Sequence, residues 1–461
     1  MNNFYHGSRH LINIESINSR GEGVGRINDW VIFVSNAVPG DHLDIEILCK
    51  KKNYSTGKIK KIIFPSPGRI TPLCEHFSLC GGCSFQTMNY KYQLNFKNEL
   101  FIKNIEKISK TSSEVIKDII PSDKIWNYRN KVQQVLYKTQ GGSIKLGFFH
   151  KDSHKVIHIK DCPIQHELSN KLMAKITSLF SKINFSIYNE KNHKGLFRYI
   201  ISRTSFSNKE FLCILVTTDE ILPYKDKFLS NLTDLPGLTG VIQNINKGDS
   251  NTVLGEKNII LWGKSCILEE IQGLKFLISS STFFQINTGQ VEKMYEIISS
   301  LILPLTGLNY VIDAYCGIGT FSLFLSNKAK YIYGIEENRE SVKLARKNSN
   351  LNKRLNIEFL CGKVEELLYT IAYNKQIDLI ILDPPRKGCE KKVIQSLEKL
   401  KIKHIIYISC NPATLARDIL FLKGIGYKIE LIQPIDMFPH TSHIESITKL
   451  SLQKEPVDDI I

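Results

Sequence analysis

The 461-residue chain is predicted to end in an α/β domain of the Rossmann type, preceded by a small β-barrel and a β-rich central domain. Short apolar runs at 310–314, 377–382 and 405–408 each stop at a turn, and helical patterns follow the first and the last of them. Such runs are typical of strands buried in a parallel sheet. We place the domain boundaries so that the three parts are 1–66, 67–280 and 281–461.

The overall composition is that of a globular protein, with 42% hydrophobic and 23% charged residues. The chain is long enough for two or three domains. Because no apolar run reaches membrane-spanning length and the first ten residues lack an apolar signal core, we expect a cytoplasmic protein without a membrane partner. The net charge of +16 favours a polyanionic partner.

The N-terminal residues 11–64 alternate and turn like strands of a small barrel, with a turn at Pro39-Gly40-Asp41. A basic segment at 50–61 closes this region and contains Tyr54. Cations interleaved with an aromatic ring suit phosphate contact and base stacking. A solvated lysine-rich hairpin fits the same residues, so this pattern alone leaves RNA binding open.

Eleven cysteines without a secretion signal favour metal binding or catalysis over disulfides. Cys74, Cys80 and Cys83 have metal-ligand spacing, and two glycines between the last two let the backbone approach a bound group. Cys162, which is followed by a proline, is the candidate for the fourth ligand. Zinc and an iron–sulfur cluster fit this ligand count equally well.

After a helix predicted at 90–110, the region from 126 to 277 is expected to be mostly short strands. Arg129 and Lys131 at its start could contact RNA phosphates, although ordinary surface ion pairs explain either residue alone.

The last domain contains a glycine turn of the kind that lets a ligand approach a helix N-terminus, at Tyr315 to Gly319. The next predicted strand ends on Glu336, 19 residues after Gly317, where a carboxylate can accept both ribose hydroxyls of a nucleoside. A dinucleotide fits this carboxylate too, but the turn departs from the dinucleotide-binding glycine pattern.

Two further strand ends carry candidate site residues. Asp383 follows the run 377–382 and is expected to contact a cofactor or orient a substrate, with a helix cap as the alternative. Cys410 follows the run 405–408, just before Pro412, which must end the strand. There a helix dipole and backbone N–H groups favour a thiolate, whereas an isolated cysteine is more often a small buried thiol.

Two long motifs resemble those of the bacterial RNA 5-methyluridine methyltransferases. SCNPATLARD, at 409–418, resembles the nucleophile motif of that family, and FPHTSHIE, at 438–445, resembles its base motif. The run from Gly21 to Asp41 is similar to the RNA-binding TRAM barrel, an OB-like fold. The resemblance implies an S-adenosylmethionine-dependent methyltransferase domain and an RNA partner.

The resemblance also implies roles for single residues. Cys410 would be the nucleophile that adds to uracil C6, and Glu445 the base that removes the C5 proton. The cofactor S-adenosylmethionine would be contacted by residues at strand ends and turns: Gln285 in an F-Q-x-N segment, Tyr315, Glu336 and Asp383. Lys363 stands where the family has a short polar residue, so we assign it no role.

Family members with a TRAM barrel carry four cysteines in the order found here. The resemblance therefore implies a [4Fe-4S] cluster held by Cys74, Cys80, Cys83 and Cys162, with a structural or RNA-positioning role. TRAM plus these cysteines resembles the members that act on 23S rRNA, and we expect a monomer. The alternatives are tRNA uridine methylation and, further away, a non-catalytic RNA-binding or assembly protein.

Overall fold

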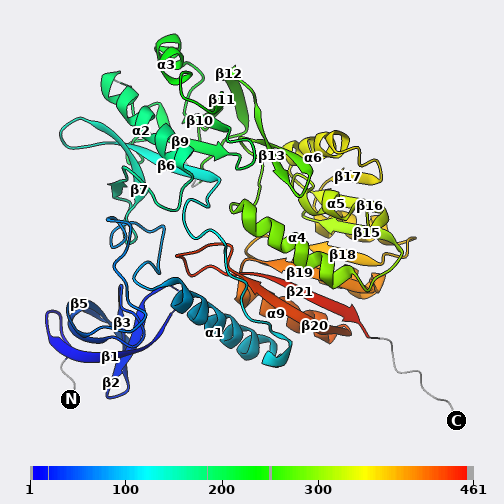
Figure 1. Ribbon diagram of the computed structural model, residues 1–461, viewed down its shortest axis with the longest axis horizontal. Helices are drawn as coiled ribbons and strands as arrows, with labels where there is room; N and C mark the ends of the chain where they lie inside the picture. The colour runs from blue at the N-terminus through cyan, green and yellow to red at the C-terminus, as the bar shows by residue number, and fades with distance from the viewer. Residues whose placement is uncertain (1–3, 19, 184, 249–251, 454–461) are drawn as a thin grey trace. The chain divides into compact units, whose positions relative to one another are not determined.

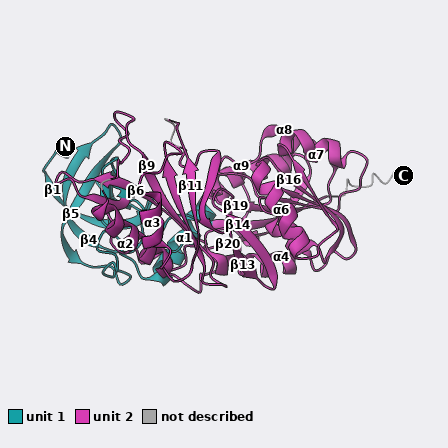
Figure 2. Cartoon of the chain, turned by 90° about the horizontal axis from the view of Figure 1, so that it is seen from above, with its two compact units in different colours: residues 1–103, 148–157, 438–444 teal, residues 104–147, 158–437, 445–461 magenta. Residues whose placement is uncertain are grey.

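The computed structural model describes residues 4–18, 20–183, 185–248 and 252–453 (Figure 1). The chain divides into two compact units (Figure 2). Unit 1 comprises 1–103, 148–157 and 438–444, and unit 2 comprises 104–147, 158–437 and 445–461. Within the described residues, no helix is long and apolar enough to cross a membrane. The division into 1–66, 67–280 and 281–461 stays a prediction.

Unit 1 begins with a closed five-stranded barrel of order β1-β2-β3-β5-β4. Its strands are β1 (Arg9–Ile17), β2 (Gly23–Ile27), β3 (Trp30–Val34), β4 (His42–Lys50) and β5 (Tyr54–Phe64). Alternate apolar residues of these strands fill the interior, among them Ile14, Ile32 and Ile45. The barrel predicted from this alternation is confirmed.

The part of a helix that belongs to unit 1 fixes the segment 438–444 of the same unit, which leads directly into Glu445. The helix is α1 (Tyr90–Ser109), close to the predicted 90–110. Gln93 accepts the His440 N–H at 3.0 Å, and the fully buried Lys97 donates to the Phe438 carbonyl at 2.9 Å. Because buried polar groups are costly unless bonded, these contacts specify one path for the segment.

The central part of the chain contains a seven-stranded sheet of order β12-β11-β10-β9-β6-β7-β8, and all of its strands except the end of β7 and most of β8 belong to unit 2. The strands are β6 (Lys131–Lys138), β7 (Ile144–Phe149), β8 (Val156–His158), β9 (Phe197–Thr204), β10 (Phe211–Thr217), β11 (Leu238–Ile245) and β12 (Lys257–Gly263). Helices α2 (Glu167–Lys182) and α3 (Lys225–Leu232) accompany it, and a short 3-10 helix at Ser113–Val115 precedes it. A hairpin of β13 (Cys266–Ile271) and β14 (Leu274–Ser279) follows.

The second seven-stranded sheet of unit 2 has the order β17-β16-β15-β18-β19-β21-β20. Its parallel strands are β15 (Leu308–Ala314), β16 (Ala329–Glu336), β17 (Ile357–Cys361), β18 (Leu379–Leu382) and β19 (His404–Ser409), and β20 (Tyr427–Ile435) and β21 (Glu445–Leu452) join antiparallel. Six helices accompany it in the described residues (Figure 1): α4 (Thr288–Ile302), α5 (Thr320–Leu325), α6 (Arg339–Leu351), α7 (Val364–Ala372), α8 (Lys391–Leu400) and α9 (Pro412–Gly424).

The strand order of this sheet reverses beside β15, because β15 pairs with β16 on one side and with β18 on the other. Ligands of open α/β sheets bind outside the carboxyl ends of the strands at such a switch point. The α/β domain predicted from the buried runs is confirmed, and every strand-end residue singled out above lies at this edge.

Candidate active site

Cys410 lies between a buried strand and a helix, as the sequence predicts. The apolar run of β19 ends at Ser409, and α9 begins at Pro412. Asn411 caps this helix, because its side-chain oxygen accepts the Ala413 N–H at 3.1 Å. Proline at the first helical position needs no hydrogen-bond acceptor. The half-buried thiol is therefore held on a rigid turn at the carboxyl edge of the sheet.

Two carboxyl groups lie close enough to Cys410 to affect its ionisation. Glu445 opens β21, the strand next to β19, where Ser446 pairs with Ser409, and it is 3% exposed. Asp383 follows β18, the neighbour of β19 on the other side. Burial, and then Glu445 and Asp383, raise the pKa of the Cys410 thiol to about 11, while Arg386 opposes this shift. The structure thus brings together the predicted nucleophile, base and orienting group.

The ionisation of the thiol differs from the sequence-based expectation. A helix N-terminus was expected to favour the thiolate, but burial and two carboxylates outweigh the dipole and favour the neutral thiol. Burial, followed by Asp383, also raises the pKa of Glu445 well above its usual range. A neighbouring carboxylate can therefore take the thiol proton when Cys410 attacks.

A buried carboxyl group on β15 extends this cluster toward the glycine turn. Asp313 accepts a 2.5 Å hydrogen bond from the Ser322 hydroxyl, and its other oxygen has no hydrogen-bond partner. Burial raises the pKa of Asp313 to about 7, with Glu336 contributing, and burial with Asp313 does the same for Asp383. We made no prediction for Asp313, although an acid inside an otherwise apolar strand is a signal that could have found it.

Glu336 and the glycine turn meet, as the predicted ribose site requires. The Glu336 carboxylate accepts the N–H of Gly317 at 3.1 Å and that of Asn338 at 2.8 Å. The turn has positive φ at Tyr315 (65°), Gly317 and Gly319. A β-carbon at Gly319 would lie 2.9 Å from Phe359, so the turn requires glycine there.

The structure fixes the remaining predicted residues through fewer contacts. Gln285 is 7% exposed in the loop before α4, where its carbonyl accepts the Asn130 amide at 2.8 Å. This hydrogen bond holds the backbone of Gln285 in place. Tyr315 is half-buried, and burial followed by the Cys389 thiol raises the pKa of its hydroxyl. Lys363, to which we assigned no role, precedes α7 without making a side-chain cap.

A buried carboxylate that we did not predict fixes the loop carrying Asp383. Asp418, on α9 and 1% exposed, accepts hydrogen bonds from the Cys389 N–H at 2.8 Å and the Tyr407 hydroxyl at 2.6 Å. The same loop is tied to α9 through the Arg386 carbonyl, which accepts from Asn411 at 3.1 Å and from the Thr414 hydroxyl at 3.2 Å. One buried charge thus positions the turns of Cys410 and Asp383 together.

Replacing Asp418 with Asn should destabilise the protein and slow catalysis. The amide removes the charge and leaves buried donors poorly bonded, which costs about 1–3 kcal/mol. A loosened loop should also lower the rate of methyl transfer on the order of tenfold. Urea unfolding and initial rates measure both effects. The control is Asp234→Asn, which removes the exposed partner of Lys175 and should change stability by less than about 1 kcal/mol. Equal effects of the two substitutions would contradict the role of Asp418.

The four predicted metal-ligand cysteines fall in both units. Cys74, Cys80 and Cys83 are half-buried in unit 1, where the Gly82 N–H donates to the Cys80 sulfur at 3.4 Å. Cys162 belongs to unit 2, and the Asn170 side chain bonds its backbone. In the described residues, no three His, Cys, Asp or Glu side chains are grouped to hold a metal ion. Thiol ligands and an N–H to sulfur contact suit a cluster chemically, but the predicted cluster gains no support from geometry.

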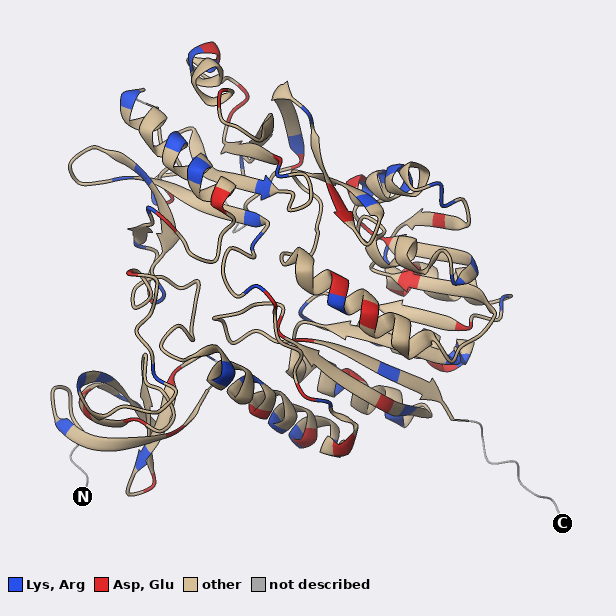
Figure 3. Cartoon of the chain, viewed as in Figure 1, with Lys and Arg blue, Asp and Glu red and all other residues tan. Residues whose placement is uncertain are grey.

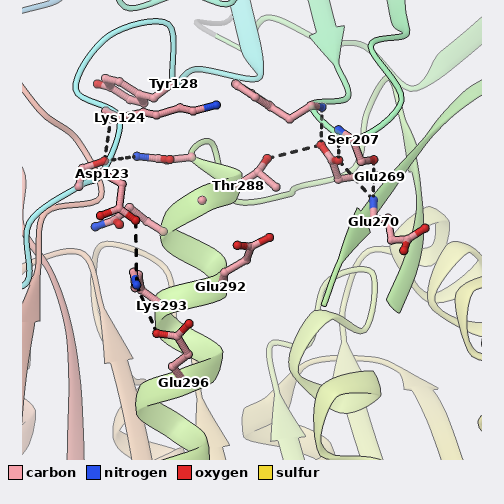
Figure 4. Close-up of a pocket in the computed structure, with 15 residues that line it drawn as sticks. Asp123, Lys124, Tyr128, Ser207, Glu269, Glu270, Thr288, Glu292, Lys293 and Glu296 are labelled. Carbon is pink, nitrogen blue, oxygen red and sulfur yellow. Dashed lines mark hydrogen bonds and ion pairs between the residues drawn. The ribbon is translucent and has the colours of Figure 1, made fainter. Parts of the chain in front are cut away.

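A separate cavity of about 360 Å³ lies in unit 2 at the start of α4 (Figure 4). Glu269, opposite the helix, accepts backbone N–H groups from Phe206 at 2.8 Å and Ser207 at 2.9 Å. Figure 4 shows Glu292, Lys293 and Glu296 along the other wall. None of the predicted site residues lines this cavity. Because Glu269 is fully bonded to the protein, we attribute a structural role to it.

Comparisons with known proteins agree with this fold. Residues 89–453 match the family described as tRNA (uracil-5-)-methyltransferase, and residues 3–60 match the TRAM domain. The fold and these two matches thus define an RNA-modifying methyltransferase with a TRAM barrel. The chain belongs to the TRAM-containing RNA uracil-5-methyltransferase family, and the resemblance stated from the motifs is confirmed.

Related sequences and a solved structure cover nearly the whole chain. An uncharacterized RNA methyltransferase of Clostridium tetani is 40% identical over 442 residues, 95% of both chains. One of Caldanaerobacter subterraneus is 39% identical over 449 residues, 97% of this chain and 99% of that protein. The crystal structure of a Pyrococcus abyssi tRNA (uracil-54, C5)-methyltransferase in complex with S-adenosyl-L-homocysteine has a TM-score of 0.76 and 28% identity, covering 96% of this chain and 100% of that one.

Proposed function

We propose that this protein transfers a methyl group from S-adenosylmethionine to C5 of a uridine in RNA through a covalent adduct on Cys410. The observation that carries the proposal is the placement of Cys410 between Glu445 and Asp383 at the carboxyl edge of the sheet. The bound S-adenosyl-L-homocysteine of the Pyrococcus abyssi relative supports the methyl donor.

The reaction needs a nucleophile because C5 of uracil is too weak a nucleophile by itself. The Cys410 sulfur adds to C6, its proton passes to a neighbouring carboxylate, and the electron pair gained at C5 attacks the methyl group. Glu445 then removes the C5 proton, and the C5–C6 double bond re-forms as the C6–S bond breaks. The departing sulfur takes back the proton from the carboxylate that first accepted it, which is Asp383 when Glu445 is the base. Asp383, whose pKa of about 7 lets it carry a proton, orients the uracil or the methyl donor.

The same edge supplies residues for the methyl donor, which provides an electrophilic methyl group on a sulfonium. Glu336 would accept the ribose hydroxyls beside the glycine turn, with Tyr315 in that turn and Gln285 on the neighbouring loop. The target base must leave its stack to reach this edge, so a loop or an opened helix is the expected substrate.

We further propose 23S rRNA as the substrate, on the basis of the TRAM barrel and the four cysteines. The alternative is tRNA, which the name of the Pyrococcus abyssi relative favours. An assay with labelled S-adenosylmethionine on unmodified 23S rRNA and on tRNA, followed by nucleoside identification, separates them. 5-Methyluridine in 23S rRNA is expected. Label confined to tRNA would overturn the substrate, and no 5-methyluridine in either RNA would overturn the function.

We propose that Cys74, Cys80, Cys83 and Cys162 bind a [4Fe-4S] cluster that helps to hold the fold or to position RNA. Protein purified without oxygen should be brown and contain about four iron and four sulfide per chain. Cys162→Ser should lose most of this iron, whereas Cys361→Ser, at an exposed cysteine, should keep it. Zinc without iron in the anaerobic wild-type protein would refute the cluster.

A further inference from the structure

Two cationic side chains of the central sheet stand directly opposite each other. β6 and β9 are antiparallel, and their register pairs Lys131 with Arg203. Figure 3 shows basic residues at the adjoining ends of these two strands. Opposed residues of an antiparallel pair share one face with their β-carbons about 5 Å apart, and like charges there are destabilising. The cost in folding stability of this like-charge pair therefore calls for an explanation.

The surroundings do not neutralise this pair. Arg203 is 2% exposed, and it donates to the Thr282 carbonyl while its Nε has no hydrogen-bond partner. Burial, then Arg203 and Arg129, lower the pKa of Lys131 to about 7. Among the described residues, no carboxylate contributes to the pKa of Lys131 or Arg203. Buried charges without a counter-charge are rare in proteins because desolvation is costly.

A third cation and the predicted cofactor loop lie beside the pair. Arg129, two residues before Lys131, also has a buried Nε without a partner. The backbone between them bonds the loop that carries Gln285, since the Asn130 N–H donates to the Ile286 carbonyl at 3.0 Å. Arg203 bonds the same loop at Thr282. The three cations therefore flank the loop on which Gln285 lies.

We propose that Lys131, Arg203 and Arg129 form a binding site for a backbone phosphate of the RNA substrate. A phosphodiester supplies the missing negative charge and several acceptors for the guanidinium N–H groups, which Arg binds in a planar, bidentate geometry. A bound phosphate would offset the like charges of the pair and favour the protonated form of Lys131. The inference rests on the proposed function in taking RNA as the ligand.

The test measures RNA binding to the full-length protein without methyl transfer, using fluorescent oligouridine as the probe. For Lys131→Met we expect the slope of log affinity against log salt to fall by about one, and affinity at low salt to fall about tenfold. The Tm without RNA should equal or exceed that of the wild type, because the substitution removes the like charge opposite Arg203. Lys131→Arg, which keeps the charge, should keep the slope. Lys330→Met is the matched control, at an exposed lysine near the start of β16.

The slope of log RNA affinity against log salt concentration decides whether the proposed phosphate site is correct. An unchanged slope in Lys131→Met overturns the proposal, as does a slope in Lys131→Arg that falls as far as in Lys131→Met. If Lys131→Met weakens binding of S-adenosylhomocysteine and leaves the slope for RNA intact, the anion is the carboxylate of the methyl donor and the RNA site is wrong. This test measures RNA binding and not methyl transfer. It can therefore support the phosphate site even if the methyl-transfer assay shows no 5-methyluridine.

Discussion

Replacing Cys410 with Ala is expected to abolish methyl transfer. Without the sulfur, uracil C5 stays too weak a nucleophile to attack the methyl donor, and the rate should fall on the order of 10³-fold or more. Labelled methyl incorporation into the accepting RNA measures this loss. RNA affinity should remain close to wild type, because the thiol is a small part of the contact surface.

The matched control for this substitution is Cys361→Ala. Cys361 ends β17 of the same sheet and is exposed, so its replacement should keep activity within about twofold of the wild type. A Cys410→Ala protein that folds and still transfers methyl groups at a rate near that of the control would refute the covalent mechanism.

Replacing Glu445 with Gln should block a later step and leave a trapped intermediate. The amide has nearly the same shape but cannot remove the C5 proton, so turnover should fall on the order of 10²- to 10⁴-fold. Cys410 can still add to C6 and the methyl group can still be transferred. A protein band shifted by covalently attached RNA should therefore survive denaturation and carry the label. Free turnover by this variant would exclude Glu445 as the base.

The stability of the Glu445→Gln protein should depend on pH in a defined direction. The pKa of Glu445 is raised in the folded state, so its contribution to stability is fully present below the unfolded pKa of about 4.3 and is lost as pH rises toward the folded pKa. Gln does not ionise and escapes this loss. The Tm of the variant relative to wild type should rise from pH 5 to pH 8. A difference in Tm that stays constant or falls over this range would contradict the raised pKa of Glu445.

Local patterns were enough to predict the elements that carry the site. The run 405–408 followed by Pro412 predicted a strand, a turn and a helix around Cys410, and the structure has all three. The same holds for the glycine turn and for Glu336 at the end of β16, because strand ends and turns are encoded by neighbouring residues. The motifs then supplied the family, which the comparisons confirm.

Features that depend on residues far apart in the chain could not be predicted. Asp418 bonds the Cys389 backbone, 29 residues away, and nothing local shows that its side chain is buried. The opposition of Lys131 and Arg203 depends on strand register, which is set by the whole sheet. The neutral thiol of Cys410 also escaped prediction, because its ionisation depends on burial and on carboxylates from β21 and the loop after β18.

The central claim, covalent addition of Cys410 to uracil with Glu445 as base, is tested most directly with RNA that contains 5-fluorouridine. Fluorine at C5 cannot leave as a proton, so the adduct should be trapped after methyl transfer even in the wild-type enzyme. Mass spectrometry of the digested adduct should find the modified, methylated nucleotide on the peptide that contains Cys410, and no adduct in Cys410→Ala. Absence of an adduct from protein that methylates normal RNA, or attachment to another cysteine, would contradict the mechanism.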